Sequence, residues 1–152
     1  MIQRFCHYLA PIIFLLVSSC GTPSISNIKE NSRNTPGRPV TVSGTVITTP
    51  LLPMSTITAS ELFDESDTIL VLSFHGKHHA QGTKASVTGI IIFLDDTNTP
   101  ANSTILSNSV TAALMRDRRT TPEKAANTTK TLINTLNKVY GSSPLSAVLI
   151  EE

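Results

Sequence analysis

Residues 85–115, ASVTGIIIFLDDTNTPANSTILSNSVTAALM, contain the change of period that decides the fold class. Up to Leu94 the side chains of two faces alternate with period two, and the last positions are apolar on both faces, as in a long strand. After the turn-forming residues DDTNTPAN, apolar residues recur every three or four positions from Ile105 to Leu114, and the preceding Ser-Thr pair offers an N-cap. The chain therefore passes here from strands to helices.

Further strands flank this stretch on both sides. We expect strands over residues 40–46, 56–62, 68–74 and 145–150, and a second helix that begins with the capping-box spacing Thr120 to Glu123 and ends at Gly141. The run 68–74 is apolar almost throughout, which predicts a central strand covered on both faces. Strands followed by helices indicate an α+β fold with a small, mainly antiparallel sheet of four to five strands, covered by two C-terminal helices.

The first twenty residues, MIQRFCHYLAPIIFLLVSSC, have the features of an export signal. Arg4 precedes an apolar run, residues 9–17, that is too short to cross a hydrocarbon core of ~30 Å as a helix. The end of this stretch, Val17-Ser18-Ser19-Cys20, resembles the lipobox of bacterial lipoproteins. The resemblance implies that residues 1–19 are a lipoprotein signal peptide and that Cys20 is acylated.

The lipobox implies a place for the protein in the cell envelope. Each buried CH₂ of an acyl chain contributes about 0.8 kcal/mol, so two or three chains at Cys20 anchor a protein almost irreversibly. Gly21 after the cysteine resembles the outer-membrane sorting pattern, which implies an outer-membrane protein facing the periplasm, with the membrane and other envelope proteins as partners. Cys6 leaves with the signal and Cys20 carries lipid, so the mature chain has no disulfide.

Residues 20–39 are rich in Ser, Thr, Asn, Pro and Gly and show no apolar period. This composition predicts a flexible, disordered tether behind the acylated cysteine, with a reach of about 60 Å when stretched. The expected organisation is a signal peptide over 1–19, a tether over 20–39 and a single α+β domain over 40–152.

The C-terminal part resembles the flagellar basal-body-associated FliL family. The matching segments are Val87–Leu94, Asp95-Asp96, Val110–Met115, Thr121-Pro122-Glu123-Lys124, Leu136–Gly141 and Ala147–Ile150. The resemblance implies a non-catalytic component of a membrane-associated apparatus. The chain departs from the family, whose members usually carry an uncleaved transmembrane helix where this chain has a lipobox.

The N-terminal half resembles an OB-type barrel in two segments, Val40–Val46 and Gly82–Ile90. Both are strands of Val and Thr with glycine, and small barrels need glycine where strands bend sharply and backbones approach. If strands 40–94 close on themselves, a barrel is favoured. If residues 145–150 enter a sheet covered on one face by both helices, the FliL-like fold is favoured.

Composition narrows the classes of function. The net charge is +1 and only 5% of residues are aromatic, with no Trp, so broad electrostatic capture of nucleic acid and stacking on bases are not expected. The sequence contains no Gly-x-Ser-x-Gly elbow, no phosphate-binding glycine loop and no nucleophile-base motif. We therefore expect no enzyme and no cofactor.

Two clusters are candidate sites. His75, His78 and His79 supply three imidazoles that can bind Zn²⁺ or Cu²⁺. Lys77 repels a cation and no fourth ligand lies nearby in the sequence, so an exposed, polar hairpin tip is the simpler interpretation. Arg116, Arg118 and Arg119 suit an acidic partner, or simply compensate the dipole at a helix end. An acidic stretch, residues 64–67, has the composition of a turn.

Two functions remain open. The first is a lipid-anchored, non-enzymatic scaffold or assembly component of the envelope, for example of a motility or secretion apparatus. The second is an OB-like periplasmic module that binds a small ligand or a metal.

Overall fold

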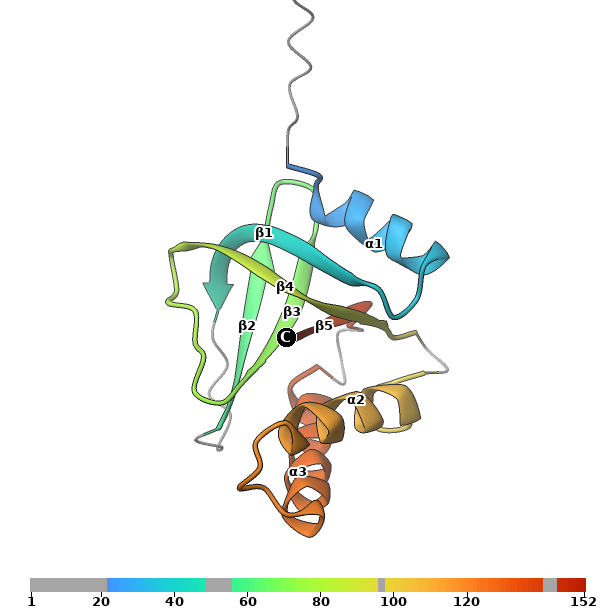
Figure 1. The fold of residues 1–152 in the computed structure, drawn as a ribbon. Helices are drawn as coiled ribbons and strands as arrows, with labels where there is room; N and C mark the ends of the chain where they lie inside the picture. The colour runs from blue at the N-terminus through green and yellow to red at the C-terminus, as the bar shows by residue number, and fades with distance from the viewer. Residues whose placement is uncertain (1–21, 49–55, 96–97, 141–144) are drawn as a thin grey trace, which may run out of the picture.

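The computed structural model describes residues 22–48, 56–95, 98–140 and 145–152, which form three helices and five strands (Figure 1). In chain order these are α1 (Ile25–Asn34), β1 (Pro39–Thr48), β2 (Ile57–Phe63), β3 (Thr68–Phe74), β4 (Lys84–Phe93), α2 (Thr104–Met115), α3 (Pro122–Tyr140) and β5 (Ala147–Glu151). The α+β class, the small sheet and the two C-terminal helices agree with the sequence prediction.

The strands close into a barrel in the order β1-β2-β3-β5-β4, with β4 returning to pair with β1. All neighbours are antiparallel except β3 and β5, which run parallel with Leu70 opposite Val148 and Leu72 opposite Ile150. The segment expected to return to the sheet therefore does so as β5, and the sheet also closes on itself. Its architecture is compatible with an OB-type barrel.

Side chains alternate along the strands between two apolar layers. The layer inside the barrel contains Ile25, Ile28, Val42, Val46, Leu62, Ile69, Val71, Val87, Ile91, Ala147 and Leu149. The layer outside lies between strands β2 to β5 and the helices α2 and α3, and it includes Leu70, Leu72, Phe74, Ile92, Val148, Leu106, Val110, Leu132 and Leu136. Because β3 contributes to both layers, all but the first of its residues are buried, as the apolar run 68–74 predicts.

Both C-terminal helices begin at capping residues close to those that the sequence predicts, but the cap of α3 is displaced by one residue. Ser103 is the N-cap of α2, and its Oγ accepts a hydrogen bond from the N–H of Leu106 at 3.2 Å. At α3, the N–H of Lys124 donates to Oγ1 of Thr121 at 3.3 Å. The capping box expected from Thr120 is therefore displaced by one residue, and Pro122 takes the first helical position, where its missing N–H costs nothing.

The prediction of a flexible tether over 20–39 is wrong for residues 25–34, which form α1. Ser24 is the N-cap of this helix, and Ile25 and Ile28, fully or almost fully buried, enter the barrel interior. A closed barrel leaves an open apolar end, and α1 covers it (Figure 1). The folded domain therefore includes α1 and starts well before residue 40.

Polar contacts hold α1 to the barrel. The Nζ of Lys29, a buried residue, donates to Oδ2 of Asp67 at 2.7 Å, to the carbonyl of Thr68 at 2.7 Å and to Oγ of Ser146 at 3.1 Å. These three acceptors lie at the β2–β3 turn and at the entry to β5. Burial of a lysine requires such partners, so the contacts fix both the position and the rotation of α1.

Closure of the barrel depends on a close approach between β4 and β5. Gly89 lies opposite Glu151, and a Cβ at this position would overlap the carbonyl oxygen of Ile150. Only glycine therefore fits at position 89 without moving the backbone of β5, in keeping with the role of glycine in small barrels.

No helix among the described residues is long and apolar enough to span a membrane.

Candidate functional site

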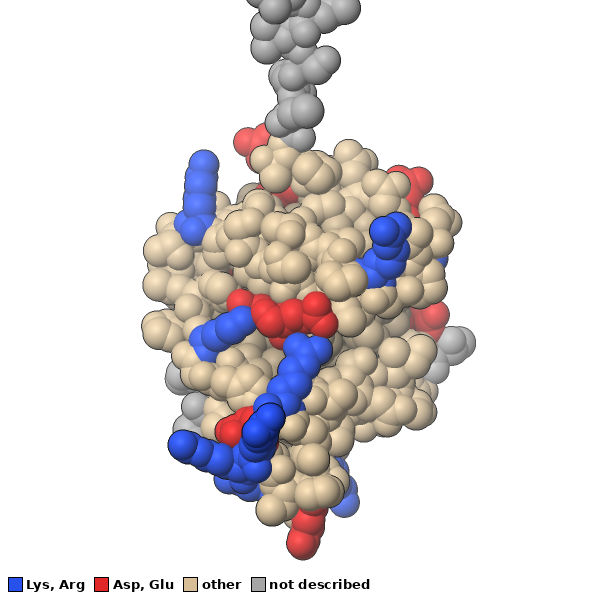
Figure 2. All heavy atoms as spheres, viewed as in Figure 1, with Lys and Arg blue, Asp and Glu red and all other residues tan. Residues whose placement is uncertain are grey.

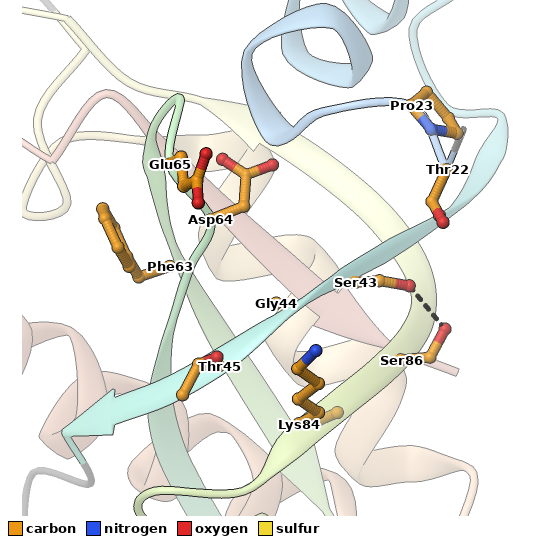
Figure 3. Close-up of a pocket in the computed structure, with 11 residues that line it drawn as sticks. Thr22, Pro23, Ser43, Gly44, Thr45, Phe63, Asp64, Glu65, Lys84 and Ser86 are labelled. Carbon is orange, nitrogen blue, oxygen red and sulfur yellow. Dashed lines mark hydrogen bonds between the residues drawn. The ribbon is translucent and has the colours of Figure 1, made fainter. Parts of the chain in front are cut away.

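A groove of about 670 Å³ opens in the barrel wall at the α1 end (Figure 3). It lies where β1 leaves β2, because β1 pairs with β2 from Thr45 onward while its earlier residues pair with β4. The β2–β3 turn and the two residues before the N-cap of α1, Thr22 and Pro23, complete its walls. Its lining consists of Thr22, Pro23, Ser43, Gly44, Thr45, Phe63, Asp64, Glu65, Lys84, Ala85 and Ser86.

Paired hydroxyls line the outer face of β1 and β4 beside and within the groove. Oγ of Ser43 and Oγ of Ser86 lie 2.9 Å apart, and Oγ1 of Thr41 and Oγ1 of Thr88 lie 2.7 Å apart. Their neighbours in the strands, such as Val42, point into the barrel and are buried. The alternation of the strands thus produces a polar outer surface, and Ser43 and Ser86 form part of the wall of the groove (Figure 3).

Two oppositely charged side chains border the groove. In Figure 3, Lys84 extends from β4 on one side of Gly44, and Glu65 lies on the other side at the β2–β3 turn. Both side chains are exposed, and neither makes a hydrogen bond or an ion pair with another residue in the described part of the chain. They present one cation and one anion to a bound molecule.

Asp64, the second carboxylate of the groove, is engaged in the fold. Its Oδ2 accepts the N–H of Ile25 at 2.6 Å, and its Oδ1 accepts the N–H of Ser66 at 2.8 Å and that of Asp67 at 3.0 Å. Burial raises the pKa of Asp64, but the hydrogen bonds from Ser66, Ile25 and Asp67 outweigh it, so the pKa is lowered. Asp64 is therefore a structural anion at the start of α1.

The surface that OB-type barrels use for oligonucleotides and oligosaccharides, the face of strands 2 and 3, is covered in this chain. Apolar side chains of α2 and α3, among them Val110, Leu132 and Leu136, pack there against Leu70 and Leu72. A ligand has no access to that face while the helices are in place.

The structure does not bring the three histidines to one point. Nε2 of His75 lies 3.1 Å from the carbonyl of Ala113, and Nε2 of His79 lies 3.3 Å from Oε2 of Glu151. Nδ1 of His78 faces its own loop at the carbonyl of Gly76. The described residues contain no group of three or more His, Cys, Asp and Glu side chains able to hold a metal. His75 and His79 therefore make contacts between elements, whereas His78 contacts its own loop.

A charged cluster surrounds the end of β5. Oε1 of Glu151 lies 3.6 Å from Nζ of Lys77, and its other oxygen lies near His79. Oε1 of Glu152 accepts a hydrogen bond from Nη2 of Arg116 at 3.0 Å. The cluster joins the β3–β4 loop and the end of α2 to β5.

The arginines separate into two kinds. Arg116 is paired with Glu152, whereas Arg118 and Arg119 are exposed in the connection between α2 and α3 and form no ion pair with another described residue. Figure 2 shows Lys and Arg side chains gathered over the α2–α3 end, away from α1. Of the candidate binding residues, Arg118 and Arg119 are thus the ones with their charges available.

Cys20, the predicted lipidation site, lies outside the described residues. It precedes Thr22 by two positions, and two extended residues span at most about 7 Å. A lipid on Cys20 would therefore attach next to the groove and α1, without a long tether between them.

Sequence reasoning did not find the groove. The strand 40–46 and the acidic stretch 64–67 were visible as patterns, but only barrel closure places them together with Lys84.

No family model matches the sequence, and no curated protein is significantly similar to it.

Proposed function

We propose that this chain is a bacterial lipoprotein, anchored through Cys20 in the outer membrane and facing the periplasm, that acts as a non-enzymatic scaffold component of the envelope. It holds its domain at the membrane surface and docks another envelope component through the exposed arginines of the α2–α3 connection. Anchoring supports docking because it raises the effective concentration of the domain for any partner in the same envelope.

The observation that carries this proposal is the way the barrel is covered. Its interior is filled by apolar side chains together with α1, and its β2–β3 face is filled by α2 and α3. A barrel covered in this way leaves its β1–β4 wall and the α2–α3 connection exposed to other molecules, which suits an adaptor.

The two ends differ in a way that suits this role. The chain enters the domain beside α1, while Arg118 and Arg119 lie at the α2–α3 end (Figure 1). Because α1 is packed into the barrel, a membrane anchored just before it would lie against one end and leave the arginines pointing outward. Exposed guanidinium groups suit carboxylates or phosphates on a partner.

The anchor is tested by fatty-acid labelling in cells. Cys20→Ala is expected to abolish incorporation and leave the uncleaved precursor, because the thiol is the acylation site. The matched control is Cys6→Ala, which alters the other cysteine, within the signal, and should leave labelling intact. Normal labelling of the Cys20 variant would disprove the anchor.

The docking surface is tested by cross-linking in intact cells. Arg118→Glu combined with Arg119→Glu is expected to reduce the recovery of cross-linked envelope proteins about tenfold, since two favourable charge interactions become repulsive. The control reverses two other exposed basic residues, Lys130 and Lys138 on α3, and changes the net charge equally. Equal loss in both variants would indicate a general charge effect and count against the surface.

The alternative of a metal-binding module has no supporting cluster among the described residues. The similarity to the FliL family stays a prediction. The alternative of a ligand-binding module is favoured by one observation, the groove beside α1, which makes ligand binding compatible with the scaffold role.

A further inference from the structure

The groove lies at the point where the proposed anchor joins the domain. Thr22 and Pro23 form part of its lining, and Cys20 is at most about 7 Å of extended chain before Thr22. The buried Ile25 and Ile28 fix α1 immediately after these residues, so the groove cannot move far from the acylated cysteine. This inference rests on the proposed anchor, which would bring the groove to the level of the lipid headgroups.

The groove has the chemistry for a molecule with both charges. Lys84 on one side and Glu65 on the other are exposed and lack partners among the described residues. Hydroxyls of Ser43 and Ser86 lie in the same wall as Lys84, and together these groups suit a phosphate. Glu65 suits an ammonium group.

The balance of charge disfavours a purely anionic ligand. The groove contains one lysine and two carboxylates, those of Asp64 and Glu65, and Asp64 stays ionised because it accepts hydrogen bonds at the start of α1. A headgroup with only negative charge would meet a net negative wall. A zwitterionic headgroup can place its ammonium group beside the extra negative charge of the groove.

An exposed aromatic ring completes the groove. Phe63 is 42% exposed, although apolar side chains of this size are usually buried in a small domain. Figure 3 shows its ring at the side of the groove, near Glu65. At a bilayer surface such a ring gains free energy by entering the boundary between headgroups and acyl chains.

We propose that this groove binds the zwitterionic headgroup of a phospholipid, phosphatidylethanolamine, in the leaflet that carries the anchor. Lys84 and the hydroxyls of Ser43 and Ser86 contact the phosphate, Glu65 contacts the ammonium, and Phe63 enters the apolar boundary. The bound lipid fixes the rotation of the domain on the membrane, which keeps the α2–α3 end turned toward the periplasm.

The experiment uses the acylated protein in vesicles of equal parts phosphatidylethanolamine and phosphatidylglycerol. A photoreactive phenylalanine analogue replaces Phe63 in one variant and Met115 in another. Met115 is a matched control because it is 39% exposed and lies at the α2–α3 end. After illumination, mass spectrometry identifies the lipid joined to each position.

We expect phosphatidylethanolamine to be the main adduct at position 63, with at least fivefold less lipid at position 115. Lys84→Ala or Glu65→Ala should lower the adduct severalfold, whereas Lys130→Ala on α3 should not. Equal labelling at the two positions, a preference for phosphatidylglycerol, or no effect of the groove variants would overturn the proposal.

The outcome also separates this proposal from the anchor. If fatty-acid labelling shows that Cys20 is not acylated, the proposed function fails. If Cys20 is acylated but position 63 forms no adduct with phosphatidylethanolamine, only the headgroup site fails.

Discussion

The barrel is covered in two places by two different kinds of contact. α2 and α3 lie on its outer face through a broad apolar layer, to which Val110, Leu132 and Leu136 belong, and Tyr140 adds a polar link by donating a hydrogen bond to Oε1 of Glu61 at 2.7 Å. Burial, followed by the hydrogen bond and the charge of Glu61, raises the pKa of this tyrosine, so its hydroxyl stays a donor.

The cover provided by α1 is smaller and more polar. Ile25 and Ile28 are its buried apolar residues, while Lys29 makes three hydrogen bonds and Asp64 holds the first N–H of the helix. Helices of ten residues are marginal alone, so α1 exists because the barrel provides an apolar end and a polar rim. A segment with little pattern of its own thus becomes structured when its surroundings supply the partners.

The largest expected effects test whether the two covers are equally part of the fold. Leu136→Ala on α3 and Ile25→Ala on α1 should each lower the free energy of unfolding by about 2–5 kcal/mol, because both side chains are buried. Urea unfolding measures the change. Ile105→Ala is the control, since Ile105 is 63% exposed and its replacement should alter stability by no more than about 0.5 kcal/mol. An effect of Ile25→Ala as small as that of the control would show that α1 is a detachable tether.

The next effect concerns β5, whose side chains contribute to both apolar layers. Gly89→Ala places a Cβ against the carbonyl of Ile150 and should cost about 1–3 kcal/mol or more, because backbone cannot move aside as a side chain can. Gly82→Ala is a useful comparison: a Cβ there meets nothing within 4 Å, but its φ of 81° still strains an L-residue. If Gly89→Ala destabilises less than Gly82→Ala in thermal unfolding, the close approach of β4 and β5 is not what requires glycine.

A smaller effect is expected for the polar part of the α1 cover. Lys29→Met keeps the buried stem but removes the amino group from Asp67, Thr68 and Ser146, which should cost about 1–2 kcal/mol. The value lies at the low end because the Asp67 side chain is 39% exposed and water can replace part of the interaction. Lys138→Met, at an exposed position of α3, is the control, and equal unfolding midpoints for the two variants would contradict the role of Lys29.

Strong periodic patterns were enough to predict most of the fold. The apolar run 68–74 coincides with β3, and the three-to-four spacing after Ser103 coincides with α2, because both elements bury wide apolar surfaces. The return of β5 followed from a short apolar run alone. Closure of the sheet stayed one of two alternatives, because it depends on pairing between β1 and β4, which lie far apart in the chain.

α1 and the groove could not be predicted for a related reason. Ile25 and Ile28 provide one apolar turn in a polar sequence, and Lys29 reads as a surface residue until Asp67 and Ser146 are placed beside it. The groove needs Lys84 near the β2–β3 turn, and no local pattern connects those segments. Both features arise from tertiary contacts between segments that are individually unremarkable in composition.

The smallest expected effect is a dependence of stability on pH at the start of α1. The pKa of Asp64 is lowered in the folded chain, so its ionised form contributes stability that is fully present above its unfolded pKa of 3.8 and is lost as the pH falls through the lower, folded pKa. Asp64→Asn should therefore destabilise the domain at about pH 6, and this penalty should shrink as the pH falls below 3.8 and the wild-type carboxyl takes up its proton. Glu65→Gln, which changes the neighbouring exposed carboxylate, should leave the profile almost unchanged. Thermal unfolding across this range measures both variants.

A penalty for Asp64→Asn that stays constant from neutral to acidic pH would contradict this prediction. It would show that the hydrogen bonds from Ile25 and Ser66 do not depend on the charge of Asp64. The polar half of the α1 cover would then rest on Lys29.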